Sequence, residues 1–155
     1  MKAEFINPFV SAALQVLQTE CRVTARKGQI SIQESPLASD DLTVLIGVTG
    51  RVQGLVLYNM SEKTAKSMVS AMTGEPIPVF DKMSESAIAE LGNVITGIAS
   101  GELEAAGYPC TIAPPSLISG RGVMISTLTI KRLVIPLELD AMGSIQIHVA
   151  LRETY

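Results

Sequence analysis

The sequence of 155 residues contains no tryptophan, one histidine and two cysteines, and aromatic residues make up only 4% of it. The two cysteines, Cys21 and Cys110, lie far apart, and no CxxC pair is present. Zinc and iron–sulfur sites need clusters of cysteine and histidine. The sequence therefore argues against a metal centre or a cofactor belonging to this protein. We expect both cysteines to be buried, reduced thiols.

Charge is also scarce, since Asp, Glu, Lys and Arg together make up 17% of the chain. The 12 basic and 15 acidic residues give a net charge of −3, and the basic residues are scattered. Nucleic acids and anionic membrane surfaces attract concentrated positive charge, so we expect neither as a partner. A hydrophobic fraction of 47% excludes a disordered chain, and the length predicts one domain over residues 1–155.

No apolar run is long enough to cross a membrane, which takes about 20 residues. The best candidate, residues 42–58, is interrupted by Arg51 and Gln53 and contains three glycines. The N-terminal residues have neither the apolar run nor the cleavage site of a signal peptide. We therefore expect a cytoplasmic protein.

Three segments have the apolar spacing of amphipathic helices: residues 8–20, 61–73 and 84–106. Asn7 and Pro8 fit the N-cap and the first position of the first helix. Ser61 fits the N-cap of the second helix, and Ser84 begins the third. Gly107 follows the third helix, where a glycine commonly ends one.

Runs rich in β-branched and alternating residues predict strands at 30–32, 42–49, 52–59, 123–130, 133–139 and 144–151. Gly50 and Arg51 separate the second and third of these runs, which indicates a hairpin. In the last run isoleucine and valine alternate with Gln146 and His148. Because alternate residues of a strand face opposite sides, we expect His148 to be solvated.

Polar and small residues gather on one side of the helix predicted at 84–106: Ser86, Glu90, Asn93, Gly97, Ser100, Gly101 and Glu104. An ordinary amphipathic helix would show such a stripe. However, Gly92, Gly97 and Gly101 each cost about 1 kcal/mol relative to alanine in a helix interior. No lysine or arginine lies on the stripe either. The helix thus presents a surface without long side chains beside Glu90 and Asn93, and such a surface allows another molecule to approach the helix closely.

The spacing Ser86-x-x-x-Glu90-x-x-Asn93-x-x-x-Gly97 resembles the signature of the CheC/CheX/FliY family of chemotaxis phosphatases, in which the first position is Asp or Ser. The chain as a whole resembles the CheX-type members. The resemblance extends to residues 5–9, 46–54 and 115–122, and so covers nearly the full length. It implies an α+β fold, with helices on one face of a largely antiparallel sheet. It also implies a homodimer whose sheets join edge to edge.

The resemblance further implies hydrolysis of the phospho-aspartate of a CheY-like response regulator, which itself carries Mg²⁺. Asn93 would hold the attacking water through its amide, which donates and accepts hydrogen bonds without titrating. Glu90 would pair with a lysine of the receiver domain. Ser86, Gly97 and Gly101 would lie in the docking surface. The protein then needs no metal and no nucleophile of its own, because it only places a water in line.

Glu4 and Asn7 repeat the spacing of Glu90 and Asn93, and both halves of the chain contain a helix followed by strands. An internal duplication is therefore plausible, and some relatives carry two active helices. Two features argue against a second site here. Asn7 is expected to cap its helix, and Ser11 stands where the signature has glycine.

Two other functions stay open. The first is a non-catalytic interaction module of the flagellar switch or the chemotaxis machinery, although a scaffold would not need the Asn93 amide. The second is small-molecule binding or redox sensing through Cys21 and Cys110. The sequence does not select the receiver, the strand at the dimer edge, or the signalling pathway.

Overall fold

The computed structural model describes residues 3–127 and 130–154. The described residues form three helices, α1 (Ala3–Cys21), α2 (Glu62–Thr73) and α3 (Lys82–Ala105). They also form ten strands: β1 (Ala25–Lys27), β2 (Ser31–Gln33), β3 (Leu37–Ala38), β4 (Leu42–Gly50), β5 (Val52–Met60), β6 (Cys110–Ile112), β7 (Ser116–Ser119), β8 (Met124–Ile125), β9 (Arg132–Leu139) and β10 (Gly143–Glu153). None of the helices in these ranges has the length and apolar content needed to cross a bilayer.

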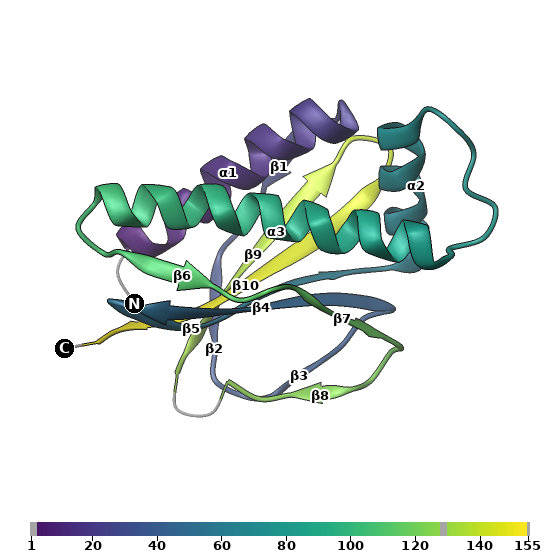
Figure 1. Cartoon of the computed structure of the whole chain (residues 1–155). Helices are drawn as coiled ribbons and strands as arrows, with labels where there is room; N and C mark the ends of the chain where they lie inside the picture. Colours follow the sequence, from purple (N-terminus) through teal and green to yellow (C-terminus); the bar gives the residue numbers. More distant parts are fainter. Residues whose placement is uncertain (1–2, 128–129, 155) are drawn as a thin grey trace.

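The main sheet has the strand order β1-β9-β10-β5-β4-β6. Strand β2 also pairs with β9, and β7 also pairs with β4. All the strand pairs in the described ranges are antiparallel. The three helices lie on one face of this sheet (Figure 1). The predicted α+β class with a largely antiparallel sheet is therefore confirmed.

The core lies between the helices and the upper face of the sheet. Strands β4 and β5 form the predicted hairpin, with Leu42 opposite Met60 and Val48 opposite Gly54. A Cβ atom at Gly54 would lie 1.8 Å from the carbonyl oxygen of Ala150, so only glycine allows β5 and β10 to approach there. The inward side chains of the central strands and helices are buried together, including Phe9, Leu17, Val44, Tyr58, Ile88, Ile95 and Ile147.

Helix α1 begins at Ala3, so the prediction that Asn7 caps it is wrong. Pro8 lies inside the helix, where its missing N–H removes one bond to the carbonyl one turn earlier. The extra turn is held by burial, because Phe5 and Ile6 are only 2% and 4% exposed. Asn7 is therefore an exposed residue of the helix proper and not its cap.

The strand predicted at 123–130 is mostly wrong. Only Met124–Ile125 is a strand, and residues 126–127 have no regular structure. Residues 128–129 of that prediction lie outside the described residues. The sequence also missed β6 and β7, which flank Pro114 and Pro115 and pair with different parts of β4. Strands of three and four residues are too short to show a period of two, and their pairing with β4 is non-local.

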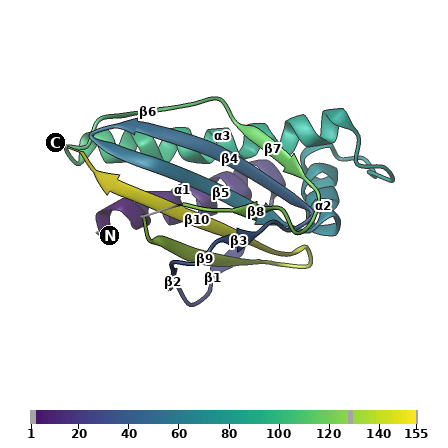
Figure 2. The same cartoon turned by 90° about the horizontal axis from the view of Figure 1, so that it is seen from below.

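The expectation that His148 is solvated is also wrong, since only 3% of this residue is exposed. The predicted alternation in burial holds only at residues 144–147, because residues 147–151 are all buried, and the separate pair β3–β8 lies over part of the second face of the sheet (Figure 2). Leu37 of β3, Leu57 of β5 and Ile125 of β8 form a small cluster there. Burial, assisted by the charge of Arg132, lowers the pKa of His148 to about 4.

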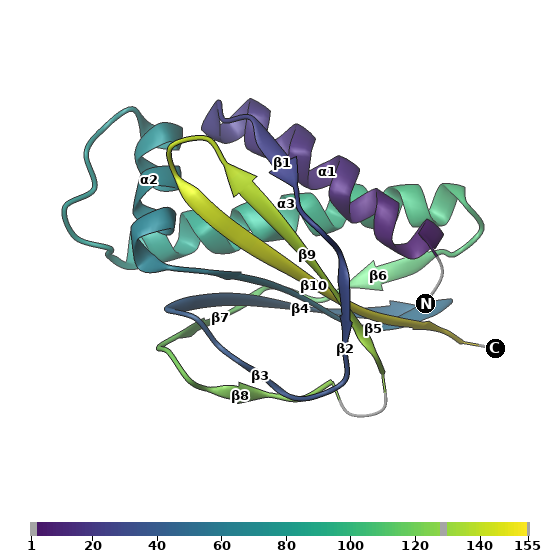
Figure 3. The ribbon, with the colours of Figure 1, turned by 180° about the vertical axis from the view of Figure 1, so that it is seen from behind.

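The two halves of the chain meet in the middle of the sheet. The hairpin β4–β5 and the hairpin β9–β10 are adjacent through β5 and β10. Helices α1 and α3 lie over the same face of the sheet, as the view from behind shows (Figure 3). An internal repeat would produce this arrangement, and the duplication stays a prediction.

Candidate functional site

Helix α3 carries the predicted site, and its start is fixed by Asp81. The Asp81 carboxylate accepts hydrogen bonds from the backbone N–H and the hydroxyl of Ser84, both at 2.9 Å. These bonds lower the pKa of Asp81 below its usual value. The helix therefore begins at Lys82, two residues earlier than predicted, because Ser84 is the partner of the cap. At the other end, Gly107 has a φ of +97° and follows the helix as predicted.

The inner side of α3 fixes how the helix is rotated over the sheet. Five apolar residues on this side are buried: Ile88, Leu91, Ile95, Ala99 and Leu103. The hydroxyls of Thr96 and Tyr58 share a buried hydrogen bond of 2.7 Å. A Cβ atom at Gly92 would lie 3.1 Å from Val44 Cγ1 and 3.2 Å from Tyr58 Cδ2. Gly92 is therefore explained by close packing of the helix on the sheet.

The outer side of α3 presents the predicted stripe to solvent. Ser86, Glu90, Gly101 and Glu104 are exposed, and Asn93, Gly97 and Ser100 are half-buried. A Cβ atom at Gly101 would meet nothing within 4 Å, and one at Gly97 would meet only Ile112 Cδ1, at 4.0 Å. Packing within the described part of the chain therefore does not require glycine at 97 or 101. The surface without long side chains that these residues form on α3 is open to solvent.

Glu90 and Asn93 are separated by one turn of α3, about 4.5 Å along the helix axis. Within residues 3–127 and 130–154, neither side chain is held by a hydrogen bond or an ion pair. A carboxylate can bind a cationic side chain, and a carboxamide can both donate to and accept from a water molecule. This pair can thus hold a lysine and a water side by side on a surface that another molecule can reach.

The second predicted pair, Glu4 and Asn7, lies on the exposed side of α1. Asn7 does not cap the helix, so one argument against a second site is removed. A different argument replaces it. The hydroxyl of Tyr108 donates a 2.8 Å hydrogen bond to the Glu4 carboxylate. The Tyr108 ring also packs edge-on against the Phe5 ring, with 5.0 Å between the two ring centroids. The Glu4 carboxylate is therefore hydrogen-bonded to the segment that follows α3, whereas the Glu90 carboxylate makes no such bond in the described residues. Ser11 is exposed at the position of the signature glycine.

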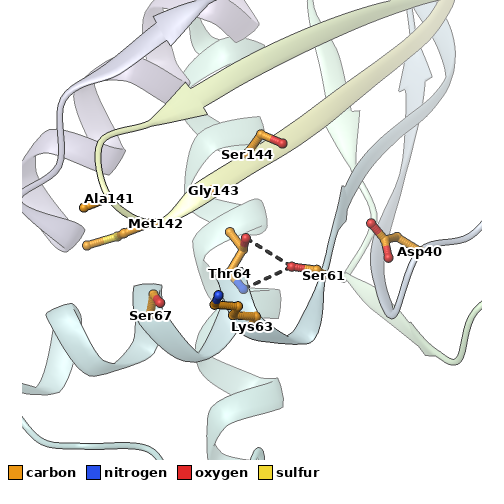
Figure 4. Close-up of a pocket in the computed structure, with 9 residues that line it drawn as sticks. All are labelled: Asp40, Ser61, Lys63, Thr64, Ser67, Ala141, Met142, Gly143 and Ser144. Atoms are coloured by element: carbon orange, nitrogen blue, oxygen red, sulfur yellow. Dashed lines mark hydrogen bonds between the residues drawn. The ribbon is translucent and has the colours of Figure 1, made fainter.

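A pocket of about 350 Å³ lies at the start of α2, beside the turn between β9 and β10 (Figure 4). The backbone N–H of Thr64 donates to the Ser61 hydroxyl at 3.1 Å, which is the N-cap bond predicted for Ser61. The Ser61 hydroxyl in turn donates to the Thr64 hydroxyl at 3.1 Å. These polar groups serve the helix terminus. Neither Glu90 nor Asn93 lines this pocket.

The two cysteines have the environment of unreactive thiols. Cys21 is buried, as predicted, while Cys110 is only half-buried. Burial raises the pKa of Cys21 to about 11 and also raises that of Cys110. Since the thiolate is the reactive form, redox sensing by these residues is disfavoured. In the described residues, no three or more His, Cys, Asp and Glu side chains are grouped to hold a metal ion.

Known proteins resemble this chain over nearly its whole length. A CheY-P phosphatase CheX of Thermotoga maritima is 28% identical over 153 residues, which are 98% of each chain. The crystal structure of a CheC-like superfamily protein from Shewanella sp. PV-4 superposes with a TM-score of 0.89 at 27% identity, covering 98% of this chain and 99% of that one.

A third relative was crystallised with its partner. In the CheX–CheY–BeF3–Mg²⁺ complex from Borrelia burgdorferi, the matching chain superposes with a TM-score of 0.81 at 28% identity, covering 96% of this chain and 98% of that one. The model of the family described as chemotaxis phosphatase CheX matches residues 42–138. That range is more than half of the chain and includes all of α3. The protein described above therefore belongs to the CheX family of chemotaxis phosphatases.

Proposed function

We propose that this protein is a hydrolase that removes the phosphoryl group from the aspartate of a CheY-like response regulator in chemotaxis. The observation that carries the proposal is the open face of α3, where Glu90 and Asn93 stand beside two glycines that internal packing does not require. The relative from Thermotoga maritima is named a CheY-P phosphatase, and the relative from Borrelia burgdorferi was crystallised with CheY. One domain over residues 1–155 would perform the reaction.

The proposed reaction is an in-line displacement on the phospho-aspartate. A water oxygen attacks the phosphorus, the bond from phosphorus to the aspartyl oxygen breaks, and free phosphate and the aspartate carboxylate are released. Asn93 would orient the water by accepting a hydrogen bond from it and donating one to it. Because an amide does not titrate near neutral pH, this role needs no shifted pKa. The acceleration would come from positioning the water.

Glu90 would hold the partner in register. Its carboxylate lies one turn before Asn93 on the same exposed side of α3 and would form an ion pair with a lysine at the active site of the receiver domain. Ser86, Gly97 and Gly101 would contact the partner directly. Small residues there would allow the receiver surface to approach the helix backbone.

The metal of the reaction would come with the substrate. We expect Mg²⁺ on the partner receiver domain, where it would neutralise the phosphoryl oxygens. The complex from Borrelia burgdorferi contains Mg²⁺ together with CheY. The residues proposed for this site supply one carboxylate and one amide on α3, which is a set for positioning and not for holding a metal of its own.

A homodimer is the oligomeric state that we propose, formed in the cytoplasm by joining two sheets edge to edge. Each end of the main sheet offers short strands: β1 and β2 on β9 at one end, and β6 and β7 on β4 at the other. Ile32 of β2 is 66% exposed. An exposed apolar residue at a sheet edge favours pairing with a strand of a second chain, whereas a charged residue there would oppose it. Either end is compatible with the proposal.

Glu4 and Asn7 are the residues of the candidate second site, and the serine at position 11 argues against it. They share the spacing and exposure of the α3 pair, but Glu4 is bonded to Tyr108. We therefore propose that most turnover comes from α3. Nothing in the structure favours a non-catalytic module of the switch over this reaction.

The test uses receivers from the same genome, each phosphorylated on its aspartate in the presence of Mg²⁺. The lifetime of the phosphoryl group is measured with and without this protein. We expect the wild-type protein to shorten the lifetime for at least one receiver. If no receiver loses its phosphoryl group faster, the proposed reaction is wrong.

A further inference from the structure

A groove of about 320 Å³ lies at the start of α3, between the end of α2, the loop of residues 74–81 and the first turns of α3. We call it the α2–α3 groove. Apolar side chains make up most of its lining: Val69, Ile77, Pro78, Val79, Met83 and Ala87. Met83 and Val79 are 80% and 70% exposed, the highest values among the large hydrophobic residues of the described chain. Exposed apolar clusters of this kind mark interaction surfaces.

The groove is continuous with the proposed phosphatase face. Met83, Ala87, Glu90 and Val94 follow each other at spacings of four, three and four residues, which places them along one side of α3. Val94 is 38% exposed on that side. Met83 precedes Glu90 by seven residues, about 10 Å along the helix. In Figure 1 the loop of residues 74–81 projects beyond the sheet beside the start of α3.

A docked receiver must touch more than the stripe on α3. Specific interfaces bury about 800 Å² on each partner and involve roughly 20–30 residues a side, whereas the stripe is one side of a single helix. Next to it, α1 presents the polar residues Glu4, Asn7, Ser11 and Gln15. At the C-terminal end of the stripe, the exposed residues Gly101, Glu102 and Glu104 offer no large apolar side chain. The two most exposed large apolar side chains of the described residues, Met83 and Val79, lie at the other end, in the α2–α3 groove.

We infer that the α2–α3 groove binds an apolar side chain of the phosphorylated receiver, from the surface next to its phosphorylation site, and that this contact selects which receiver is hydrolysed. The inference rests on the proposed phosphatase function. Apolar anchors in pockets carry much of the energy of an interface. Met83 suits this role, because its flexible thioether adapts to the shape of the inserted side chain. Glu90 and Asn93 would then act on any receiver that the groove has accepted.

The experiment measures hydrolysis at several concentrations of a phosphorylated receiver that is a substrate. The variants Met83→Ser and Val79→Ser remove apolar surface from the groove without touching the buried core. Met124→Ser is the matched control, since Met124 is 65% exposed on β8, on the other face of the sheet. We expect KM to rise about fivefold or more for the groove variants, with kcat within about twofold of wild type. The control should match wild type in both.

Asn93→Ala, assayed in parallel, separates the two proposals. If Asn93→Ala lowers kcat and Met83→Ser leaves KM unchanged, the groove inference is wrong and the phosphatase function stands. If Asn93→Ala matches wild type, the phosphatase site itself is wrong, and the inference falls with it. The mass of each variant in solution is measured as well. A change of oligomeric state in Met83→Ser would assign the groove to a second copy of this chain and would overturn the inference.

Discussion

The three glycines of α3 allow a stability prediction that separates packing from docking. Replacing Gly101 with alanine adds a Cβ atom that meets nothing within 4 Å. The variant should gain the helix propensity of alanine, about 1 kcal/mol, and a chain of this size should melt about 2–4 °C higher. Replacing Gly92 gains the same propensity but pushes Cβ against Val44 and Tyr58, at 3.1 and 3.2 Å.

Tyr58 cannot easily move to make room at Gly92. It is 2% exposed, and its hydroxyl is bonded to Thr96 at 2.7 Å. Overpacking of this kind costs about 1–3 kcal/mol, which offsets or exceeds the gain in propensity. Gly92→Ala should therefore melt below wild type or level with it, and Gly101→Ala above it. Thermal unfolding followed by circular dichroism measures both. Equal upward shifts would show that the helix is not packed on the sheet as described.

A large side chain at position 101 tests docking of the receiver instead of stability of the fold. Gly101→Leu places a large side chain in open space on the docking face, so the fold should tolerate it while the partner should not. We expect KM for the phosphorylated receiver to rise about tenfold or more, with no drop in melting temperature. If Gly101→Leu hydrolyses the receiver with wild-type KM, the exposed side of α3 at Gly97 and Gly101 is not a docking surface.

Three further predictions concern other parts of the molecule. His148 has a folded pKa of about 4, below its unfolded value of 6.5, so protonation favours unfolding. Stability should therefore fall between pH 6.5 and pH 4, by up to about 3 kcal/mol, and His148→Phe should flatten this part of a urea-unfolding pH profile. Tyr108→Phe removes the hydrogen bond to Glu4 and should leave the rate of hydrolysis within about twofold of wild type, because the site on α3 performs the reaction. A large gain in the rate would reveal an active site on α1. EDTA should stop hydrolysis, and Mg²⁺ should restore it, without any change in the melting temperature of the phosphatase alone.

Elements with local signals were predicted correctly from the sequence. Ser61 caps α2, and Gly107 follows α3 in the left-handed conformation with a φ of +97°, because both signals depend on neighbours within one turn. The β4–β5 hairpin follows from two apolar runs around Gly50 and Arg51. The outward stripe of α3 follows from helical periodicity alone, and its residues are exposed or half-buried as expected.

The errors came from contacts between distant parts of the chain. The early start of α1 depends on burial of Phe5 and Ile6 against residues far along the sequence, and no local signal shows this. The burial of His148 was missed because no local signal shows that β3 and β8, in which Leu37 pairs with Ile125, lie over part of the second face of the sheet (Figure 2). Gly92 could not be told from Gly101 by sequence, since the difference lies in what each faces across the core.

The most direct test of the proposed site is the phosphoryl lifetime of a receiver incubated with Asn93→Ala, beside wild type and Glu90→Ala. Asn93→Ala removes the amide that would hold the water and leaves the rest of the exposed side of α3 unchanged. We predict that it binds the phosphorylated receiver with near wild-type affinity but loses turnover by about 100-fold or more, while Glu90→Ala weakens both. An Asn93→Ala protein that hydrolyses the receiver as fast as wild type would contradict the proposed mechanism.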